Sequence, residues 1–264
     1  MYWQKTAALV PLLLIICNAQ TGKGRNQTEN MMENSDEDIS TIILRMNKGA
    51  PGFLLEGDLL IQRTRNAMKC LDDSSSCLWP KSDEGMVDVP FILHAEYDST
   101  DRETILNAMR MFELKTCVRF VPRGNQQSYL SIEPNLGCSS SMGRIGGKQL
   151  LSLQRGGCVY YGIVQHELLH ALGFYHEQNR SDRDNYVQIH YENIPEYYLN
   201  NFQKMDTNNL YTPYDYGSVM HYGRTAFGNG KETITPIPNP NVPIGQRIGM
   251  SDIDILRINK LYKC

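Results

Sequence analysis

The chain has 264 residues, a length that fits one large domain or two small ones. Its formal net charge of -3 is small for this length, which gives no reason to expect binding to nucleic acid or to an anionic membrane surface. After the first residues, no stretch is apolar and long enough to span a bilayer.

Residues 1–19 have the pattern of a secretory signal peptide. Lys5 precedes an apolar run at residues 7–16, and small residues suited to signal peptidase follow it. We therefore expect a secreted, extracellular protein, and storage in secretory granules is left open. Loss of Cys17 with the signal leaves an even set of cysteines, which in an exported protein is most simply a set of disulfides whose pairing the sequence leaves open. These are Cys70, Cys77, Cys117, Cys138, Cys158 and Cys264.

Residues 20–65 are predicted to form a pro-segment. Polar residues dominate from residue 20 to residue 40, a composition that cannot fold by itself, and Asn26 lies in a glycosylation sequon there. Apolar residues return in short bursts between residues 41 and 61. Arg65 ends a basic site that a trypsin-like protease could cut, so we expect Asn66 to begin a catalytic domain at residues 66–264.

The first half of this domain is predicted to contain strands and two helices. The expected strands are residues 87–93, 118–121, 129–132 and 150–153. Pro90 lacks a backbone donor, so the first strand is not expected to be a central one. A first helix, residues 101–114, follows a capping-box pattern at Thr100, and a second should run from about Val159 to Gly173. Later residues indicate irregular structure until a last helix runs from about Ser251 towards Tyr262.

The second helix carries the pattern His-Glu-x-x-His. His166 and His170 are four residues apart, so both imidazoles leave one face of the helix and can share a metal ion. Gly173 can adopt the left-handed conformation that ends a helix, which would bring His176 back as a third ligand. Three histidines with one open position describe a catalytic zinc site, and Glu167 is placed to take a proton from water there.

A bare His-Glu-x-x-His occurs by chance in unrelated chains. The extended form, with Gly173 and His176 followed by a methionine turn at Met220, is the more specific pattern of metzincin metalloproteases.

The stretch at residues 166–184 resembles the signature of the astacin family of secreted zinc endopeptidases. Shorter segments across the rest of residues 66–264 also resemble that family, among them residues 138–144, 214–218 and 244–247. The resemblance implies an α+β fold of the metzincin type. Its N-terminal part would be a twisted sheet with two long helices, including the zinc helix, and its C-terminal half would be mostly irregular with one final helix.

The resemblance also implies roles for individual residues. His166, His170 and His176 would bind one Zn²⁺ per chain, with Glu167 as general base and later proton donor. Tyr222 would stabilise the tetrahedral intermediate, and Met220 would form an apolar floor beneath the imidazoles. A peptide substrate would add as a strand along residues 139–144. The implied disulfides join Cys117 to Cys264, Cys138 to Cys158 and Cys70 to Cys77.

Activation is implied by a motif in the pro-segment. The residues from Leu55 to Asp58 resemble the family motif in which an aspartate occupies the open zinc position, although the family usually has phenylalanine where Leu55 stands. After cleavage behind Arg65, the new amino terminus at Asn66 is expected to make a water-linked contact with Glu177, because a buried carboxylate needs a partner.

The extra cysteine pair near the expected mature start is most similar to the six-cysteine group that includes fish hatching enzymes. The leading expectation is a monomeric zinc endopeptidase, made as a zymogen and activated by a trypsin-like protease, that degrades egg envelope glycoproteins. No membrane or nucleic-acid partner is expected. Two alternatives remain: a six-cysteine relative of another tissue with other protein substrates, and a catalytically inactive zinc-binding protein.

Overall fold

The structure of the chain is a computed structural model, and it describes residues 37–60 and 77–264. The predicted signal peptide, the Asn26 sequon, the cleavage site at Arg65 and Asn66, and Cys70 lie outside these residues. Within the two described ranges, no helix is long and apolar enough to cross a membrane.

The elements follow one another in two groups. The first contains α2 (Ile39–Met46), β1 (Leu54–Leu55), β2 (Leu59–Leu60), β3 (Val87–Leu93), α3 (Ser99–Lys115), β4 (Val118–Pro122), β5 (Tyr129–Glu133), β6 (Cys138–Ser141), β7 (Lys148–Leu153) and α4 (Tyr161–Ala171). The second contains η2 (Glu177–Asn179), η3 (Arg183–Asn185), β8 (Val187–Ile189), η4 (Tyr191–Asn193), η5 (Glu196–Phe202), β9 (Ile234–Pro236) and α5 (Asp252–Leu261), where η marks a 3₁₀ helix.

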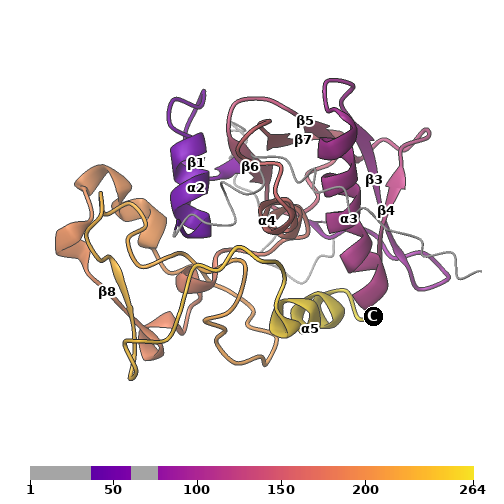
Figure 1. Cartoon of the computed structure of the whole chain (residues 1–264). Coiled ribbons are helices and arrows are strands. Elements are labelled where there is room, and N and C mark those ends of the chain that lie inside the picture. Colours follow the sequence, from indigo (N-terminus) through magenta and orange to yellow (C-terminus); the bar gives the residue numbers. More distant parts are fainter. Residues whose placement is uncertain (1–36, 61–76) are drawn as a thin grey trace, which may run out of the picture. The chain divides into compact units, whose positions relative to one another are not determined.

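The first group forms a seven-stranded mixed sheet in the order β1-β2-β6-β7-β5-β3-β4. Strands β4, β3, β5 and β7 run parallel, and β6 runs antiparallel to β7. Helices α3 and α4 contact each other and pack against the sheet (Figure 1). Fully buried apolar side chains such as Phe112 of α3, Leu130 of β5 and Leu168 of α4 fill this core. The predicted α+β class, with a sheet and two long helices in the first half, is confirmed.

The expectation that β3 is not a central strand is wrong, because β3 lies between β4 and β5. Residues 87–91 pair with β4, whereas residues 91–93 pair with β5, so the two sets overlap only at Phe91. Pro90 therefore has a paired strand on one side only. Proline has no backbone N–H to donate, and residue 90 has no paired strand on the β5 side that would need this hydrogen bond. Proline is therefore tolerated at this position inside the sheet.

The N-cap of α3 is Asp98 and not Thr100. The Asp98 carboxylate accepts hydrogen bonds from the backbone N–H groups of Thr100 and Asp101, and the Asp101 carboxylate accepts one from the Asp98 N–H. This is a reciprocal capping box built from two aspartates. The sequence pattern at Thr100 has the right residue types, but it lies two residues too late.

Helix α2 was not predicted from the sequence. Asp38 caps its first turn, and Ile39, Ile42 and Ile43 are buried against the rest of the described chain. Eight residues are too few for a helix to be stable alone in water, so α2 depends on this packing. Helix propensity and the spacing of apolar residues over so short a segment are too weak to predict α2 from the sequence.

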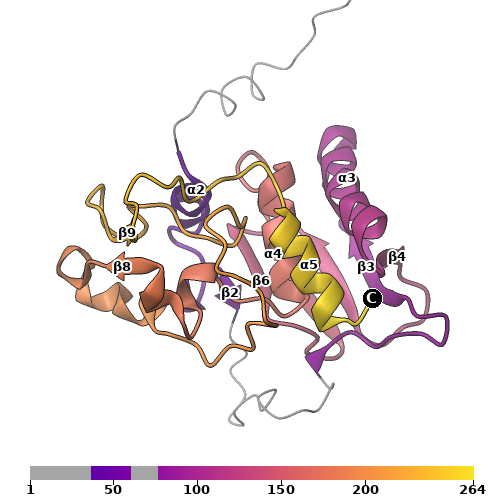
Figure 2. The ribbon, with the colours of Figure 1, turned by 90° about the horizontal axis from the view of Figure 1, so that it is seen from below.

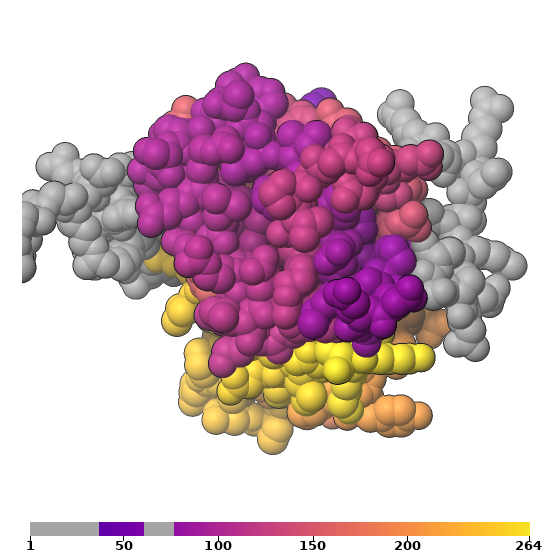
Figure 3. All heavy atoms as spheres, turned by 90° about the vertical axis from the view of Figure 1, so that its right-hand side faces the viewer, coloured from indigo at the N-terminus to yellow at the C-terminus, as the bar shows by residue number. Residues whose placement is uncertain are grey.

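The second group is mostly irregular, as predicted, and ends in α5. Figure 2 shows β8 and β9 on one side, α3, β3 and β4 on the other, and α5 between them in this view. Disulfide Cys117–Cys264 joins the chain just after α3 to residue 264, and the C-terminal part of the chain, in yellow, lies at the bottom of Figure 3. A second disulfide joins Cys138 and Cys158. Cys77 is disulfide-bonded, and its expected pairing with Cys70 stays a prediction.

Candidate metal centre

The three histidines of the motif come together in the interior. His166 and His170 leave one face of α4, and both are buried. Gly173 has a φ of +102°, so the chain leaves the helix in a left-handed turn as the sequence predicts. That turn returns His176 to the same point, where its Nε2 atom lies 3.2 Å from the Nε2 atom of His166.

Each imidazole is oriented by an acceptor on its outer nitrogen. The Nδ1 atom of His166 lies 2.9 Å from the Val219 carbonyl oxygen, and that of His170 lies 2.7 Å from the Phe174 carbonyl oxygen. The Nδ1 atom of His176 lies 2.6 Å from a carboxylate oxygen of Glu56. Because these oxygens accept hydrogen bonds, each Nδ1 carries the proton and donates it. Neutral imidazoles held in this way direct their Nε2 lone pairs at one common point.

Asp58 supplies a fourth donor at this point. Its carboxylate oxygens lie 3.1 Å from Nε2 of His166, 3.4 Å from that of His170 and 3.3 Å from that of His176. Tetrahedral zinc with bonds of about 2.05 Å would place its ligand atoms about 3.3 Å apart. The Nε2 atom of His170 and one Asp58 oxygen are buried without a hydrogen-bond partner in the described part of the chain, and a metal ion would satisfy both. The donor set therefore fits zinc.

Glu167 lies beside these ligands but outside the cluster of metal-binding groups. Its side chain is fully buried, and neither carboxylate oxygen has a hydrogen-bond partner among the described residues. Burial, and then the nearby Asp58 carboxylate, raise the pKa of Glu167 well above its ordinary value. A buried carboxyl group without partners is unfavourable for stability, so it is typical of a functional position.

Tyr222 also lies in the centre, with its ring centroid 4.5 Å from that of His176. Its hydroxyl donates a hydrogen bond to the backbone carbonyl of Glu56. Burial raises the pKa of Tyr222 well above its ordinary value, and the Asp58 and Glu56 carboxylates add to the effect. The phenol therefore stays protonated and remains a donor at neutral pH. Met220 is buried, and its carbonyl accepts a hydrogen bond from the Glu177 N–H.

Glu177 is already partnered in this structure. The Arg257 guanidinium contacts both of its carboxylate oxygens, and Arg180 and the backbone N–H of Asp215 contact one of them. The Glu177 carboxylate therefore has the partners that a buried charge needs without a contact from the new amino terminus. Asn66 lies outside the described residues, and its contact with Glu177 stays a prediction.

Two residues of the centre were assigned no role from the sequence. Glu56 lies two residues before Asp58 in the motif at residues 55–58, so its place in that motif is a signal that could have been used. Arg257 is 80 residues from Glu177, and no local pattern indicates their contact.

This geometry agrees with a match to a known family. The family model described as Astacin, a peptidase family, matches residues 75–263. The chain belongs to the astacin family. It is 56% identical to the low choriolytic enzyme of Oryzias latipes over 266 residues, which covers 98% of each chain. It is 57% identical to high choriolytic enzyme 1 of the same fish over 229 residues, covering 86% of this chain and 84% of the relative.

A solved structure agrees with the family assignment. High choriolytic enzyme 1, described as a hatching enzyme zinc-protease from medaka, superposes with a TM-score of 0.71 at 59% identity and covers 75% of this chain and 100% of its own. As an astacin with this donor set, the protein is a zinc metalloendopeptidase that acts on proteins.

The separation of Glu167 from the metal-binding cluster generates a testable prediction. Glu167→Gln should keep about one zinc per chain but lower turnover by about 10²- to 10⁴-fold, because the amide cannot accept a proton. Metal analysis and a casein assay of the activated enzyme measure the two effects. His170→Ala is the control that should lose zinc, and comparable zinc loss in Glu167→Gln would show that the glutamate is a ligand.

Proposed function

We propose that the protein is a secreted astacin zymogen whose mature enzyme degrades egg envelope proteins at hatching. The observation that carries the zymogen part is the position of Asp58, a residue of the predicted pro-segment, at the fourth corner of the histidine site. A carboxylate there is a suitable zinc ligand and excludes water from the open position. A trypsin-like protease would remove it by cutting after Arg65, and the released domain would act as a monomer.

The pro-segment also covers the expected substrate edge. Strand β2 pairs with β6 through Leu59 and Leu60, and the Ser140 N–H donates a hydrogen bond to the Asp58 carbonyl oxygen at 3.1 Å. An extended peptide bound along residues 139–144 would need the same backbone groups. Activation would therefore free both the metal site and the strand edge.

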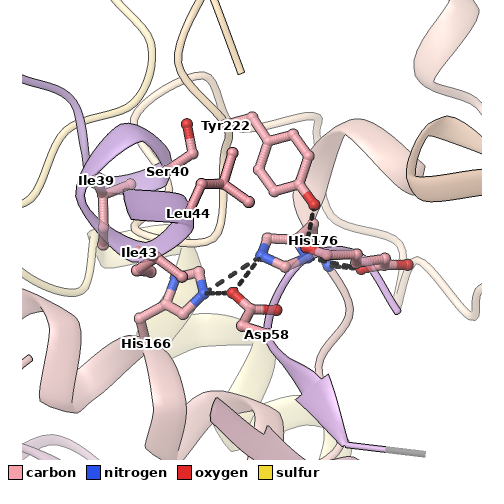
Figure 4. A pocket seen from close by; sticks show the side chains of 9 residues that line it. Ile39, Ser40, Ile43, Leu44, Asp58, His166, His176 and Tyr222 are labelled. Atoms are coloured by element: carbon pink, nitrogen blue, oxygen red, sulfur yellow. Dashed lines mark hydrogen bonds and ion pairs between the residues drawn. The ribbon is translucent and has the colours of Figure 1, made fainter. Parts of the chain in front are cut away.

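Helix α2 closes the remaining side of the centre. Figure 4 shows Ile39, Ile43 and Leu44 of α2 above His166 and Asp58, with Tyr222 beside them. The start of α2 lies against backbone of the catalytic domain: the Ser40 hydroxyl accepts a hydrogen bond from the Gly223 N–H at 3.0 Å. A Cβ atom on Gly223 would lie 2.1 Å from Cγ of Asp38, so a side chain there would have to displace the Asp38 carboxylate that caps α2.

The residues of the centre can divide the hydrolytic work among them. Zinc, when bound, acts as a Lewis acid and lowers the pKa of water. Glu167 would accept a proton from the attacking water and return it to the leaving amine. Tyr222 would donate to the oxyanion that forms on the substrate carbonyl. Its present hydrogen bond to the Glu56 carbonyl supports this role, because a peptide carbonyl already occupies the place beside the phenol.

Similarity over nearly the whole chain to a choriolytic enzyme supports the egg envelope as substrate. A six-cysteine relative from another tissue is the alternative within the family. The presence of Glu167 and Tyr222 in the expected geometry argues against an inactive zinc-binding protein.

The first of three further predictions tests latency. Asp58→Ala in a chain that also carries Arg65→Ala should hydrolyse a short fluorogenic peptide without activation, because the fourth zinc position is then open. Adding Ile43→Asp should raise this activity further by displacing α2. Glu37→Ala, a change at a half-buried carboxylate of the same segment that pairs with Arg45, is the control and should stay latent. The chain must be shown intact by mass spectrometry, and a fully latent Asp58→Ala chain would falsify the aspartate switch.

The second prediction concerns Tyr222. In the activated enzyme, Tyr222→Phe should lower kcat by about 10²-fold, equivalent to about 3 kcal/mol, and change KM much less. The ring stays in place, so packing against His176 is retained. Unchanged kcat would leave Tyr222 as a packing residue.

The third prediction tests the substrate. The activated enzyme should swell or solubilise isolated fish egg envelopes, and the Glu167→Gln enzyme at equal concentration should not. Normal activity on casein with no effect on envelopes from several fish would favour the relative from another tissue.

A further inference from the structure

Helix α5 directs two buried charged side chains towards the metal centre. Asp254 and Arg257 are three residues apart and so lie on one face of the helix. Their relative exposures are only 3% and 7%. Buried charges are costly unless they are fully paired, so the partners of these two residues define what the helix does.

The Asp254 carboxylate accepts the Ser251 N–H in the capping box of its own helix at 2.9 Å, and its other two side-chain partners lie in the methionine turn. One carboxylate oxygen accepts a hydrogen bond from the Ser218 hydroxyl at 2.6 Å, and the other accepts one from the Val219 N–H at 3.1 Å. The carbonyl oxygen of Val219 in turn accepts the hydrogen bond from Nδ1 of His166. A single residue, Val219, thus connects the Asp254 carboxylate to the first histidine of the site.

The partner of Arg257 directly follows the third histidine. The guanidinium contacts both oxygens of Glu177, with Nη2 lying 2.8 Å from Oε1, and its Nε donates to the Thr212 hydroxyl at 2.9 Å. The Glu177 N–H donates to the Met220 carbonyl at 2.9 Å, which joins the two chain segments that α5 holds. The far end of α5 is fixed by the Cys117–Cys264 disulfide.

We propose that Asp254 and Arg257 are positioning residues that hold His166 and His176 in the geometry that retains zinc. Asp254 acts through Val219, and Arg257 acts through Glu177. The inference uses the proposed zinc ligands, but it does not depend on the substrate or on the activation step. Groups that orient metal ligands from outside typically change metal affinity or activity by about 10- to 100-fold when they are altered.

The proposal is tested by the rate at which a chromogenic chelator removes zinc from the zinc-loaded full chain at 25 °C. Asp254→Asn leaves one acceptor oxygen where the carboxylate has two, so the side chain can no longer accept from both the Ser218 hydroxyl and the Val219 N–H, and we expect release about 10-fold faster than in the unaltered chain. Asp252→Asn, an exposed aspartate in the same helical turn, is the matched control and should not change the rate.

Arg257 is tested by two substitutions. Arg257→Met should accelerate zinc release in the same way, and Arg257→Lys should restore only part of the normal rate, because one ammonium group cannot contact both Glu177 oxygens in the geometry of the guanidinium. If Asp254→Asn does not fold, Ser218→Ala replaces it and should give a smaller acceleration, since it removes one of the carboxylate contacts.

If Asp254→Asn and Arg257→Met lower the melting temperature but release zinc at the same rate as Asp252→Asn, the proposal is overturned and α5 is a structural element only. His170→Ala separates this failure from an error in the ligand assignment. If that variant binds zinc normally, the ligands themselves are wrong; if it loses zinc while Asp254→Asn and Arg257→Met release zinc at the normal rate, only the role of α5 fails.

Discussion

The arrangement of the centre depends on three imidazoles whose Nε2 lone pairs are directed at one point. Each lone pair is aimed by a hydrogen bond on the opposite side of its ring, to Val219, Phe174 or Glu56. These acceptors come from the methionine turn, from the turn after α4 and from the predicted pro-segment. A helix alone would position only the first two histidines, so the irregular half of the chain and the segment before Asn66 are both parts of the centre.

The described residues of the predicted pro-segment occupy three places that a substrate and water would need. Asp58 takes the fourth corner of the metal site, β2 takes the edge of β6, and the carbonyl of Glu56 takes the hydrogen bond of Tyr222. These contacts lie within five residues of chain, so in the proposed zymogen a short motif would block several functions at once. The Glu56 carboxylate also accepts a hydrogen bond from Nδ1 of His176, and removal of the segment would break this contact.

Local patterns predicted the parts of the fold and the site that local physics decides. The spacing of His166 and His170, the glycine at 173 and the apolar runs of β3 and α3 act over a few residues, and their predictions agree with the structure. Helix α2 was missed because tertiary packing stabilises it. Pro90 misled the placement of β3 because the strand changes partners at Phe91. The contacts of Arg257 join positions far apart in sequence, which no spacing rule connects.

A substitution at Gly223 would affect the predicted pro-segment more than the zinc site. The three nearest atoms to a Cβ placed there all belong to Asp38, a residue of the predicted pro-segment, so the lack of a side chain at this position would serve the proposed precursor. An allele with a larger residue at position 223 would keep every zinc ligand but weaken the packing of α2 against this part of the chain. In the proposed secreted zymogen, the damage would fall on the cell that makes the protein, where proteolysis would begin too early. Selection on Gly223 would then continue even though the proposed activation would remove the segment that requires it.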